Sequence, residues 1–188
     1  SDVVERLGLE RGNYIVVSAH REENKKKKNQ FEVLAESLNA VADKYKMQII
    51  FSTHPRTRNR MQKSNFVFNP LIQTVAPLGF FDYVKLQQNA YVVLSDSGTI
   101  SEESAMMGFA AVSIRTSTER PEAVDAGTIV LGGVSTDSML NAIEITKGLA
   151  INQSSQLPYE YLVTNTSERI VKVIQSYTPI VNKVIWDK

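Results

Sequence analysis

The stretch VVLSDSGTISEESAMMG, residues 92–108, decides the fold of this chain. It opens with an apolar run that is typical of a buried strand. It closes with a helix over residues 99–107 that ends at Gly108, because glycine tolerates the left-handed backbone at a helix end. The Thr-x-x-Glu spacing of Thr99 and Glu102 predicts a capping box at the start of that helix. The stretch therefore predicts a strand, a short polar loop and a helix in direct succession.

The same alternation continues on both sides of this stretch. Short apolar runs predict strands, and segments with apolar residues three or four apart predict amphipathic helices. Such alternation favours the α/β class, with a Rossmann-like, doubly wound parallel sheet. The expected strands are 14–18, 48–52, 91–94, 111–114 and 128–131, with short strands or extended pieces at 65–68 and 72–75. The expected helices are 29–46, 81–89, 99–107, 121–126, 135–149 and 167–177.

Length and composition exclude several classes of protein. The 188 residues suit one α/β domain, which we place at 1–150, followed by a connector and a C-terminal helix at 151–188. A net charge of +1 gives no strong attraction to nucleic acid, and no apolar stretch is long enough to cross a membrane. The absence of cysteine excludes disulfides and thiolate metal sites and is compatible with the cytoplasm. Because the chain starts without an initiator Met, we expect it to be part of a longer protein.

The polar loop between the strand and the helix of the opening stretch is a candidate anion site. Ligands of open α/β sheets bind beyond the carboxyl ends of the strands, where this loop lies. Gly98 removes a side chain where a ligand would approach, Ser97 offers a hydroxyl, and the helix offers free N–H groups and its positive dipole end. The alternative is an ordinary capped helix start, since the loop has no Walker lysine or three-glycine fingerprint.

Two adjacent acids, Glu102 and Glu103, lie in the first helical turn. One of them can complete the capping box, and the other can face a ligand. A carboxylate is a poor partner for phosphate but a good acceptor for ribose hydroxyls, so the pair favours a nucleotide diphosphate over free phosphate. The alternative is that both acids only complement the helix dipole.

Positively charged side chains follow three of the other predicted strands. His20 and Arg21 come after the strand at 14–18, His54 after 48–52, and Arg115 and Arg120 after 111–114. Each taken alone could be a structural histidine or a basic turn. Because parallel strands end at one edge of the sheet, their convergence predicts an anionic ligand.

Five segments, taken in order, carry a resemblance to a known family: SAHREEN, STHPRTR, PLGFFDYVKL, LSDSGTISEE and TERPEAVDAGT. Over residues 13–133 they resemble the carboxyl-terminal half of the non-hydrolysing UDP-N-acetylglucosamine 2-epimerases. The sequences of the first two segments look most like those of the branch that serves N-acetyl-L-fucosamine synthesis for capsule and O-antigen. The resemblance implies one half of a glycosyltransferase-B type enzyme, with a C-terminal crossover helix that returns toward the first domain.

The resemblance also implies roles for individual residues. Ser97, Gly98 and Thr99 would contact the diphosphate, Glu103 the ribose, and Tyr83 the uracil. His20 would contact the diphosphate and stabilise it as the leaving group, and Arg21, His54, Arg115 and Arg120 are further candidates for binding UDP. Thr99 departs from the family's usual glycine, and Lys25–Lys28 replace a glycine-containing loop.

The reaction that the resemblance implies inverts C2 of a UDP-2-acetamido sugar by anti elimination of UDP and its re-addition. It needs neither metal nor nicotinamide, and the groups that move the C2 proton belong to the family's other domain. Because those groups lie on the other domain, we expect this chain to bind UDP without turnover. The resemblance also favours a homodimer when the protein is full length, and we expect the protein in the cytoplasm. The alternatives are the donor-binding half of a glycosyltransferase-B type glycosyltransferase and a non-catalytic nucleotide-sensing domain.

Overall fold

The computed structural model describes residues 1–19, 30–53, 57–59, 61, 66–148 and 157–187. The chain divides into two compact units, Ser1–Leu157 and Pro158–Lys188. The domain boundary that we expected at residues 150 and 151 lies outside the described residues.

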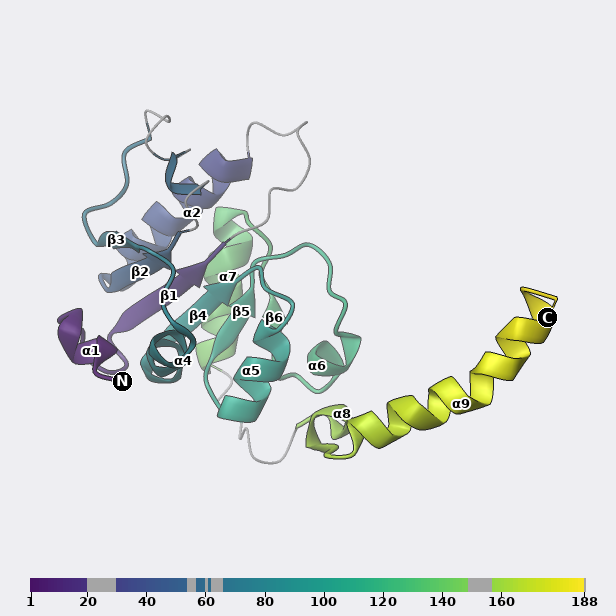
Figure 1. The fold of residues 1–188 in the computed structure, drawn as a ribbon. Coiled ribbons are helices and arrows are strands. Elements are labelled where there is room, and N and C mark those ends of the chain that lie inside the picture. Colours follow the sequence, from purple (N-terminus) through teal and green to yellow (C-terminus); the bar gives the residue numbers. More distant parts are fainter. Residues whose placement is uncertain (20–29, 54–56, 60, 62–65, 149–156, 188) are drawn as a thin grey trace. The chain divides into compact units, whose positions relative to one another are not determined.

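The first unit contains a six-stranded sheet in which every pair of neighbouring strands is parallel (Figure 1). Its order is β3-β2-β1-β4-β5-β6, which is the order of a doubly wound Rossmann-like sheet. This confirms the predicted fold class. The strands are β1 (Tyr14–Ser18), β2 (Gln48–Ser52), β3 (Ile72–Val75), β4 (Val92–Ser95), β5 (Ala111–Ser113) and β6 (Val130–Leu131).

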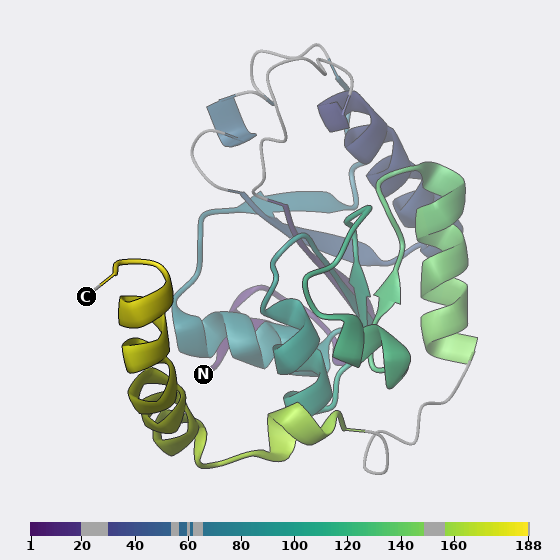
Figure 2. The same cartoon turned by 90° about the vertical axis from the view of Figure 1, so that its right-hand side faces the viewer.

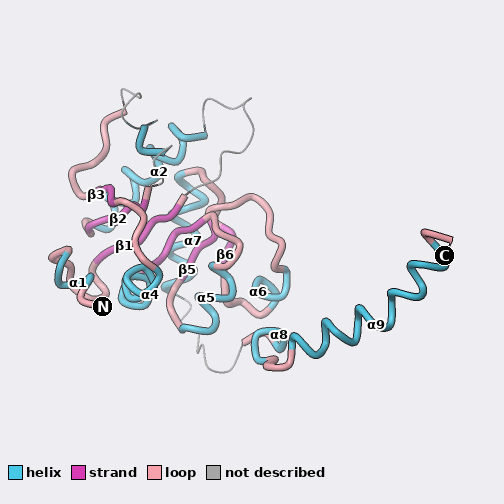
Figure 3. Tube along the Cα trace, viewed as in Figure 1, coloured by secondary structure: helices cyan, strands magenta, loops and turns pink. Residues whose placement is uncertain are grey.

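The central strands form because their residues are buried on both faces of the sheet. All five residues of β1 and all four of β4 are buried, which explains their continuous apolar runs. One face packs against α2 (Gln30–Tyr45) and α7 (Thr136–Gly148), and the core there includes Leu38 and Met139. The other face carries α4 (Phe80–Asn89) and α5 (Ile100–Met107), so the strands form the middle layer (Figure 2, Figure 3). The unit also contains the short helices α1 (Val3–Arg6) and α6 (Pro121–Asp125), and residues 57–59 are helical.

For 65–68 we expected a short strand or an extended piece; residues 66–68 belong to no strand and form a loop. The two phenylalanines pack on each other and on α2: the rings of Phe66 and Phe68 lie edge to face, and Phe68 also meets Phe31 of α2. The side chain of Asn39 satisfies the local backbone: its Nδ2 donates to the carbonyl of Val67 at 2.9 Å. The apolar residues that suggested a strand therefore include two phenylalanines that pack against a helix.

The order of the strands creates a switch point between β1 and β4. From β1 the chain proceeds outward to β2 and β3, and it then returns to the other side of β1 through β4. The carboxyl ends of the two strands are joined directly, since the amide of Asp96 donates to the carbonyl of Ser18 at 3.1 Å. Ligands of doubly wound sheets bind in the crevice at this position.

The second unit is helical and contains α8 (Tyr159–Leu162) and α9 (Thr166–Val184). The expectation that the last helix ends before Pro179 is wrong, because α9 continues through it. The apolar spacing that predicts the helix also continues past the proline, at Ile180, Val181 and Val184. Among the residues that the structure describes, no helix is both long and apolar enough to cross a membrane.

Candidate functional site

The loop between β4 and α5 lies at the switch point. It follows directly from the buried Ser95, whose hydroxyl accepts a hydrogen bond from the amide of Ser97 at 3.1 Å. The helix is anchored against the sheet by buried Ile100, Ser101 and Ser104. Because the loop and the first turn are held from both ends, the N-terminus of α5 and its positive dipole end are fixed at the crevice.

The capping box predicted for this helix is wrong. Thr99 is the N-cap residue, but its backbone is in the right-handed helical region (φ −73°, ψ −9°) and its side chain caps no N–H group. Its hydroxyl instead donates to Oε1 of Glu103 at 2.8 Å, and Glu102 turns toward Arg120. The interpretation of this segment as an ordinary capped helix start therefore loses its main support.

The carboxylate of Glu103 is held from two sides. Thr99 donates to Oε1, and the amide Nε2 of Gln87 donates to Oε2 at 2.9 Å. Gln87 belongs to α4 and is fully buried, whereas Glu103 is half-buried. The hydroxyl of Ser97 lies 3.0 Å from that of Thr99, so a continuous hydrogen-bond chain links the loop to α4.

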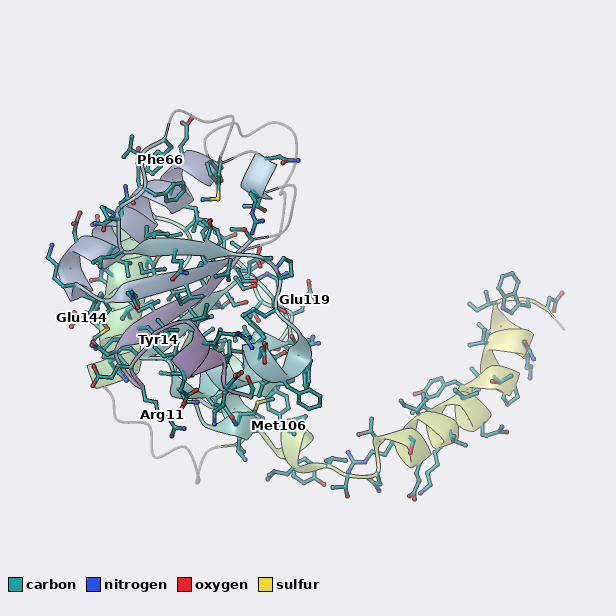
Figure 4. The ribbon with its side chains drawn as sticks, turned by 60° about the vertical axis from the view of Figure 1, so that its left-hand side comes forward. Arg11, Tyr14, Phe66, Met106, Glu119 and Glu144 are labelled. Carbon is teal, nitrogen blue, oxygen red and sulfur yellow. The ribbon has the colours of Figure 1, made fainter. Side chains whose placement is uncertain are left out.

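Arg115 brings a buried positive charge to the same loop. Its side chain is only 8% exposed, and its Nη1 lies 3.8 Å from the position that a Cβ on Gly98 would occupy. Its carboxylate partner is Glu119, 3.4 Å away on a side chain that is 67% exposed. Glu119 lies at the end of the unit opposite Glu144 (Figure 4). The structure thus places Arg115 against the predicted anion site.

The glycine at position 98 is not required by the fold around it. Its φ lies outside the left-handed region, unlike that of Gly108, which ends α5 at φ 72° as predicted. Among the described residues, an added Cβ would meet only Arg115, at an ordinary van der Waals distance. No other described residue fills the space beside Gly98, as expected for a place where a ligand approaches the backbone.

Arg120 is tied to the first turn of α5. Its Nε donates to Oε1 of Glu102, and its own backbone amide donates to the Thr118 hydroxyl at 3.0 Å. The other oxygen of Glu102, Oε2, is buried and has no hydrogen-bond partner among the described residues. This pair connects the segment before Pro121, at the start of α6, to the candidate site.

Tyr83 reaches the switch point from α4. Its side chain is half-buried and hydrogen-bonds to that of Ser18, the last residue of β1. Burial raises the pKa of Tyr83, and the hydrogen bond to Ser18 acts in the opposite direction. The structure thus brings Tyr83 to the edge where the loop after β4 lies.

Three of the predicted site residues, His20, Arg21 and His54, lie outside the described residues. The structure brings together the remaining candidates at the carboxyl edge and adds one residue that sequence reasoning missed, Gln87. The signal for it was a polar residue at a helix position next to the buried Leu86. Within the described ranges, no cluster of three or more Asp, Glu or His side chains is arranged to hold a metal ion.

The strand order, the polar loop and the buried arginine define a Rossmann-like α/β protein with its candidate site at the topological switch point. The family described as UDP-N-acetylglucosamine 2-epimerase matches residues 1–175. The chain therefore belongs to the UDP-N-acetylglucosamine 2-epimerase family, and the family that the sequence motifs predicted is confirmed.

Individual relatives agree with this assignment. A UDP-N-acetylglucosamine 2-epimerase of Methanocaldococcus jannaschii is 30% identical over 166 residues, which cover 86% of this chain and 44% of the relative. The structure of UDP-N-acetylglucosamine 2-epimerase from Rickettsia bellii is 34% identical, has a TM-score of 0.82, and is matched over 100% of this chain and 51% of that one. The M. jannaschii enzyme in complex with UDP-GlcNAc and UDP is 28% identical, with a TM-score of 0.74 over 94% of this chain and 49% of that one.

The chain spans about half the length of the relatives that it matches. Its fold matches one Rossmann-like half of these structures, which have the glycosyltransferase-B type architecture. The narrower assignment, to the branch that serves N-acetyl-L-fucosamine synthesis, stays a prediction.

Proposed function

We propose that this chain is the UDP-binding half of an isomerase that inverts C2 of a UDP-linked 2-acetamido sugar. The proposal rests on one observation: the buried Arg115 lies against Gly98, directly before the N-terminus of α5. Positive groups fixed in this way suit a diphosphate, which gains negative charge when it leaves the sugar. The complex of the M. jannaschii relative with UDP-GlcNAc and UDP supports this class of ligand.

Each part of the nucleotide has a candidate partner. The diphosphate would lie on Ser97, Gly98 and Thr99, with Arg115 behind the loop. Glu103 would accept hydrogen bonds from the ribose, and the Tyr83 ring would lie near the uracil. Arg120, held by Glu102, would add positive charge at the edge of the site. His20, Arg21 and His54 follow β1 and β2 in the chain, and their assignment to the diphosphate remains a prediction.

The proposed reaction has two balanced steps. First, a base removes the C2 proton while the C1–O bond breaks, and its electrons leave with UDP to give a 2-acetamidoglycal. Then a proton is added to the opposite face of C2 while a UDP oxygen forms the bond to C1. This chain would stabilise the leaving and returning diphosphate. The substrate would be UDP-GlcNAc or UDP-ManNAc, or the 6-deoxy-L-hexose equivalent.

The groups that handle the C2 proton would come from a second α/β domain of the same protein. The present chain would then bind UDP but not catalyse the reaction, and the full-length protein would act as a cytoplasmic homodimer. A glycosyltransferase with the same architecture would share the nucleotide site, but the family match over residues 1–175 favours the epimerase.

Calorimetric titration of this chain with UDP, UMP and ADP tests the binding part of the proposal. UDP is expected to bind more tightly than either control, because UMP lacks the second phosphate and ADP the uracil. Equal affinities for the three nucleotides, or no binding of UDP, would contradict it. The reaction is tested in the full-length enzyme, where deuterium from heavy water should enter at C2 of the sugar.

A further inference from the structure

Gln87 is a buried polar residue whose amide points into the candidate site. Its side chain is 0% exposed, and its Nε2 donates to Oε2 of Glu103 at 2.9 Å. A carboxylate oxygen accepts hydrogen bonds, so the amide must present its nitrogen, not its oxygen, to Glu103. The orientation of the Gln87 side chain is therefore set by Glu103.

The same orientation leaves the other end of the amide without a partner. Oε1 of Gln87 is buried and has no hydrogen bond among the residues that the structure describes. A buried carbonyl without a hydrogen bond destabilises the fold, and an apolar side chain of similar length would avoid this penalty. The core around Leu86 thus gives no reason for a glutamine, whereas Glu103 does.

The two hydrogen bonds to Glu103 leave its carboxylate with a defined acceptor capacity. Oε2 receives one bond from Gln87, and Oε1 receives one from Thr99 at 2.8 Å. Each carboxylate oxygen can accept a second bond. Two adjacent oxygens with one free acceptor position each match two adjacent hydroxyl groups, such as the 2′ and 3′ hydroxyls of a ribose.

We propose that Gln87 is a positioning residue that fixes the Glu103 carboxylate for the two ribose hydroxyls of the nucleotide, an inference that rests on the proposed function. Because Gln87 is fully buried, it acts through Glu103 and does not touch the nucleotide. Its loss should therefore affect recognition of the ribose hydroxyls and leave the contribution of the diphosphate unchanged.

The test compares UDP with 2′,3′-dideoxy-UDP in the wild-type chain and in Gln87→Met. Methionine keeps the length and suits burial, but it has no N–H donor. In the variant, the ratio of the affinity for UDP to that for 2′,3′-dideoxy-UDP should fall by roughly fivefold or more, the equivalent of one hydrogen bond. Its affinity for 2′,3′-dideoxy-UDP should stay within about twofold of wild type, since that nucleotide makes no ribose hydroxyl contact. Gln88→Met, an exposed neighbour on α4, is the matched control and should behave like wild type.

A merely structural role of Gln87 would give a different result. In a Glu103→Gln background, Gln87→Met should have no further effect on the ratio of the two affinities, because both changes act on the same contact. A folded Gln87→Met chain with the wild-type ratio would overturn the proposal. Should that variant not fold, the side-chain amide signal of Gln87 in the wild-type NMR spectrum decides: UDP should shift it and 2′,3′-dideoxy-UDP should not, and equal shifts overturn the proposal.

The same titrations separate this inference from the proposed function. A wild-type chain that does not bind UDP overturns both. A wild-type chain that binds UDP and 2′,3′-dideoxy-UDP equally well overturns the ribose role of Glu103, and with it that of Gln87, while the UDP site stands.

Discussion

The guanidinium of Arg115 lies against Gly98, with Nη1 3.8 Å from the position that a Cβ there would take. The two residues come from loops that follow neighbouring parallel strands, β4 and β5. The parallel strands therefore place the buried Arg115 guanidinium beside the Gly98 backbone, at the N-terminus of α5. This relationship is the physical basis of the diphosphate site that we propose.

Replacing Arg115 by Met should weaken binding of UDP by about 1.5–3 kcal/mol, the range for hydrogen bonds to charged groups. Binding of UMP should change less if Arg115 acts mainly on the second phosphate. The chain should stay folded, because the carboxylate that loses its partner, Glu119, is 67% exposed and so leaves no buried unpaired charge. Calorimetry with both nucleotides measures the effect, and Arg11→Met, an exposed charge elsewhere on the unit (Figure 4), is the control. An equal loss for UMP and UDP would argue against this role of Arg115.

The substitution Gly98→Ala should separate stability from binding. Its Cβ makes only an ordinary contact and φ is compatible, so the free energy of unfolding should be unchanged or rise by about 0.4–1 kcal/mol. Binding of UDP should weaken by roughly tenfold or more, about 1.4 kcal/mol, because the methyl group fills the space beside the loop. Urea unfolding and calorimetry give the two values, with Gly148→Ala as the control for the substitution itself. Wild-type affinity in Gly98→Ala would show that no ligand approaches this glycine.

The substitution Glu103→Ala should weaken UDP binding by about 1–3 kcal/mol, since the ribose would lose its charged acceptor. The protein should remain folded, because the side chain is half-buried in the first turn of α5 and its removal leaves no charge unpaired. Glu144→Ala, which removes an acid at the other end of the unit, should bind UDP like wild type (Figure 4). Calorimetry of the two variants side by side checks the expectation, and equal affinities would contradict a ribose contact at Glu103.

Tyr83 should contribute its ring to binding and its hydroxyl to stability. Tyr83→Phe keeps the ring, so UDP affinity should change by no more than about twofold, whereas Tyr83→Ala should lose about 1–3 kcal/mol, the range for base stacking on an aromatic side chain. Calorimetry on the two variants distinguishes ring from hydroxyl. If phenylalanine and alanine weaken binding equally, the ring has no part in it.

The raised pKa of Tyr83 also predicts a pH dependence. Burial favours the neutral phenol in the folded chain, so its contribution to stability is complete below the unfolded pKa of about 10 and is lost as pH rises through the higher folded pKa. Tyr83→Phe should therefore lose less stability than wild type between neutral pH and about pH 10.5. Urea unfolding at both pH values measures the difference, and identical losses would mean that the phenol titrates alike in both states.

Most of the fold followed from the sequence because its signals are local and strong. Buried parallel strands such as Tyr14–Ser18 and Gln48–Ser52 are continuous apolar runs, and glycine ends α5 for a conformational reason. The segment 66–68 is also a short apolar run, but its phenylalanines pack on α2. This contact depends on the tertiary structure and cannot be predicted from local sequence.

The candidate site was predictable in position but not in its contacts. Parallel strands place their following loops at one edge, so the convergence at Gly98 could be expected. The predicted capping box does not form because the Thr99 hydroxyl can either accept a hydrogen bond from a backbone N–H or donate one to Glu103, and local spacing does not decide between them. Gln87 was missed because its partner lies on another helix, sixteen positions further along the chain.

The diphosphate site at the switch point is tested by titrating the isotope-labelled chain with UDP and following its backbone amide signals by NMR. We expect the largest shifts at Gly98, Thr99 and the first turn of α5, and smaller shifts with UMP. Signals that stay unchanged at millimolar UDP, or shifts centred on the opposite end of the sheet near Glu144, would contradict a diphosphate site at the switch point.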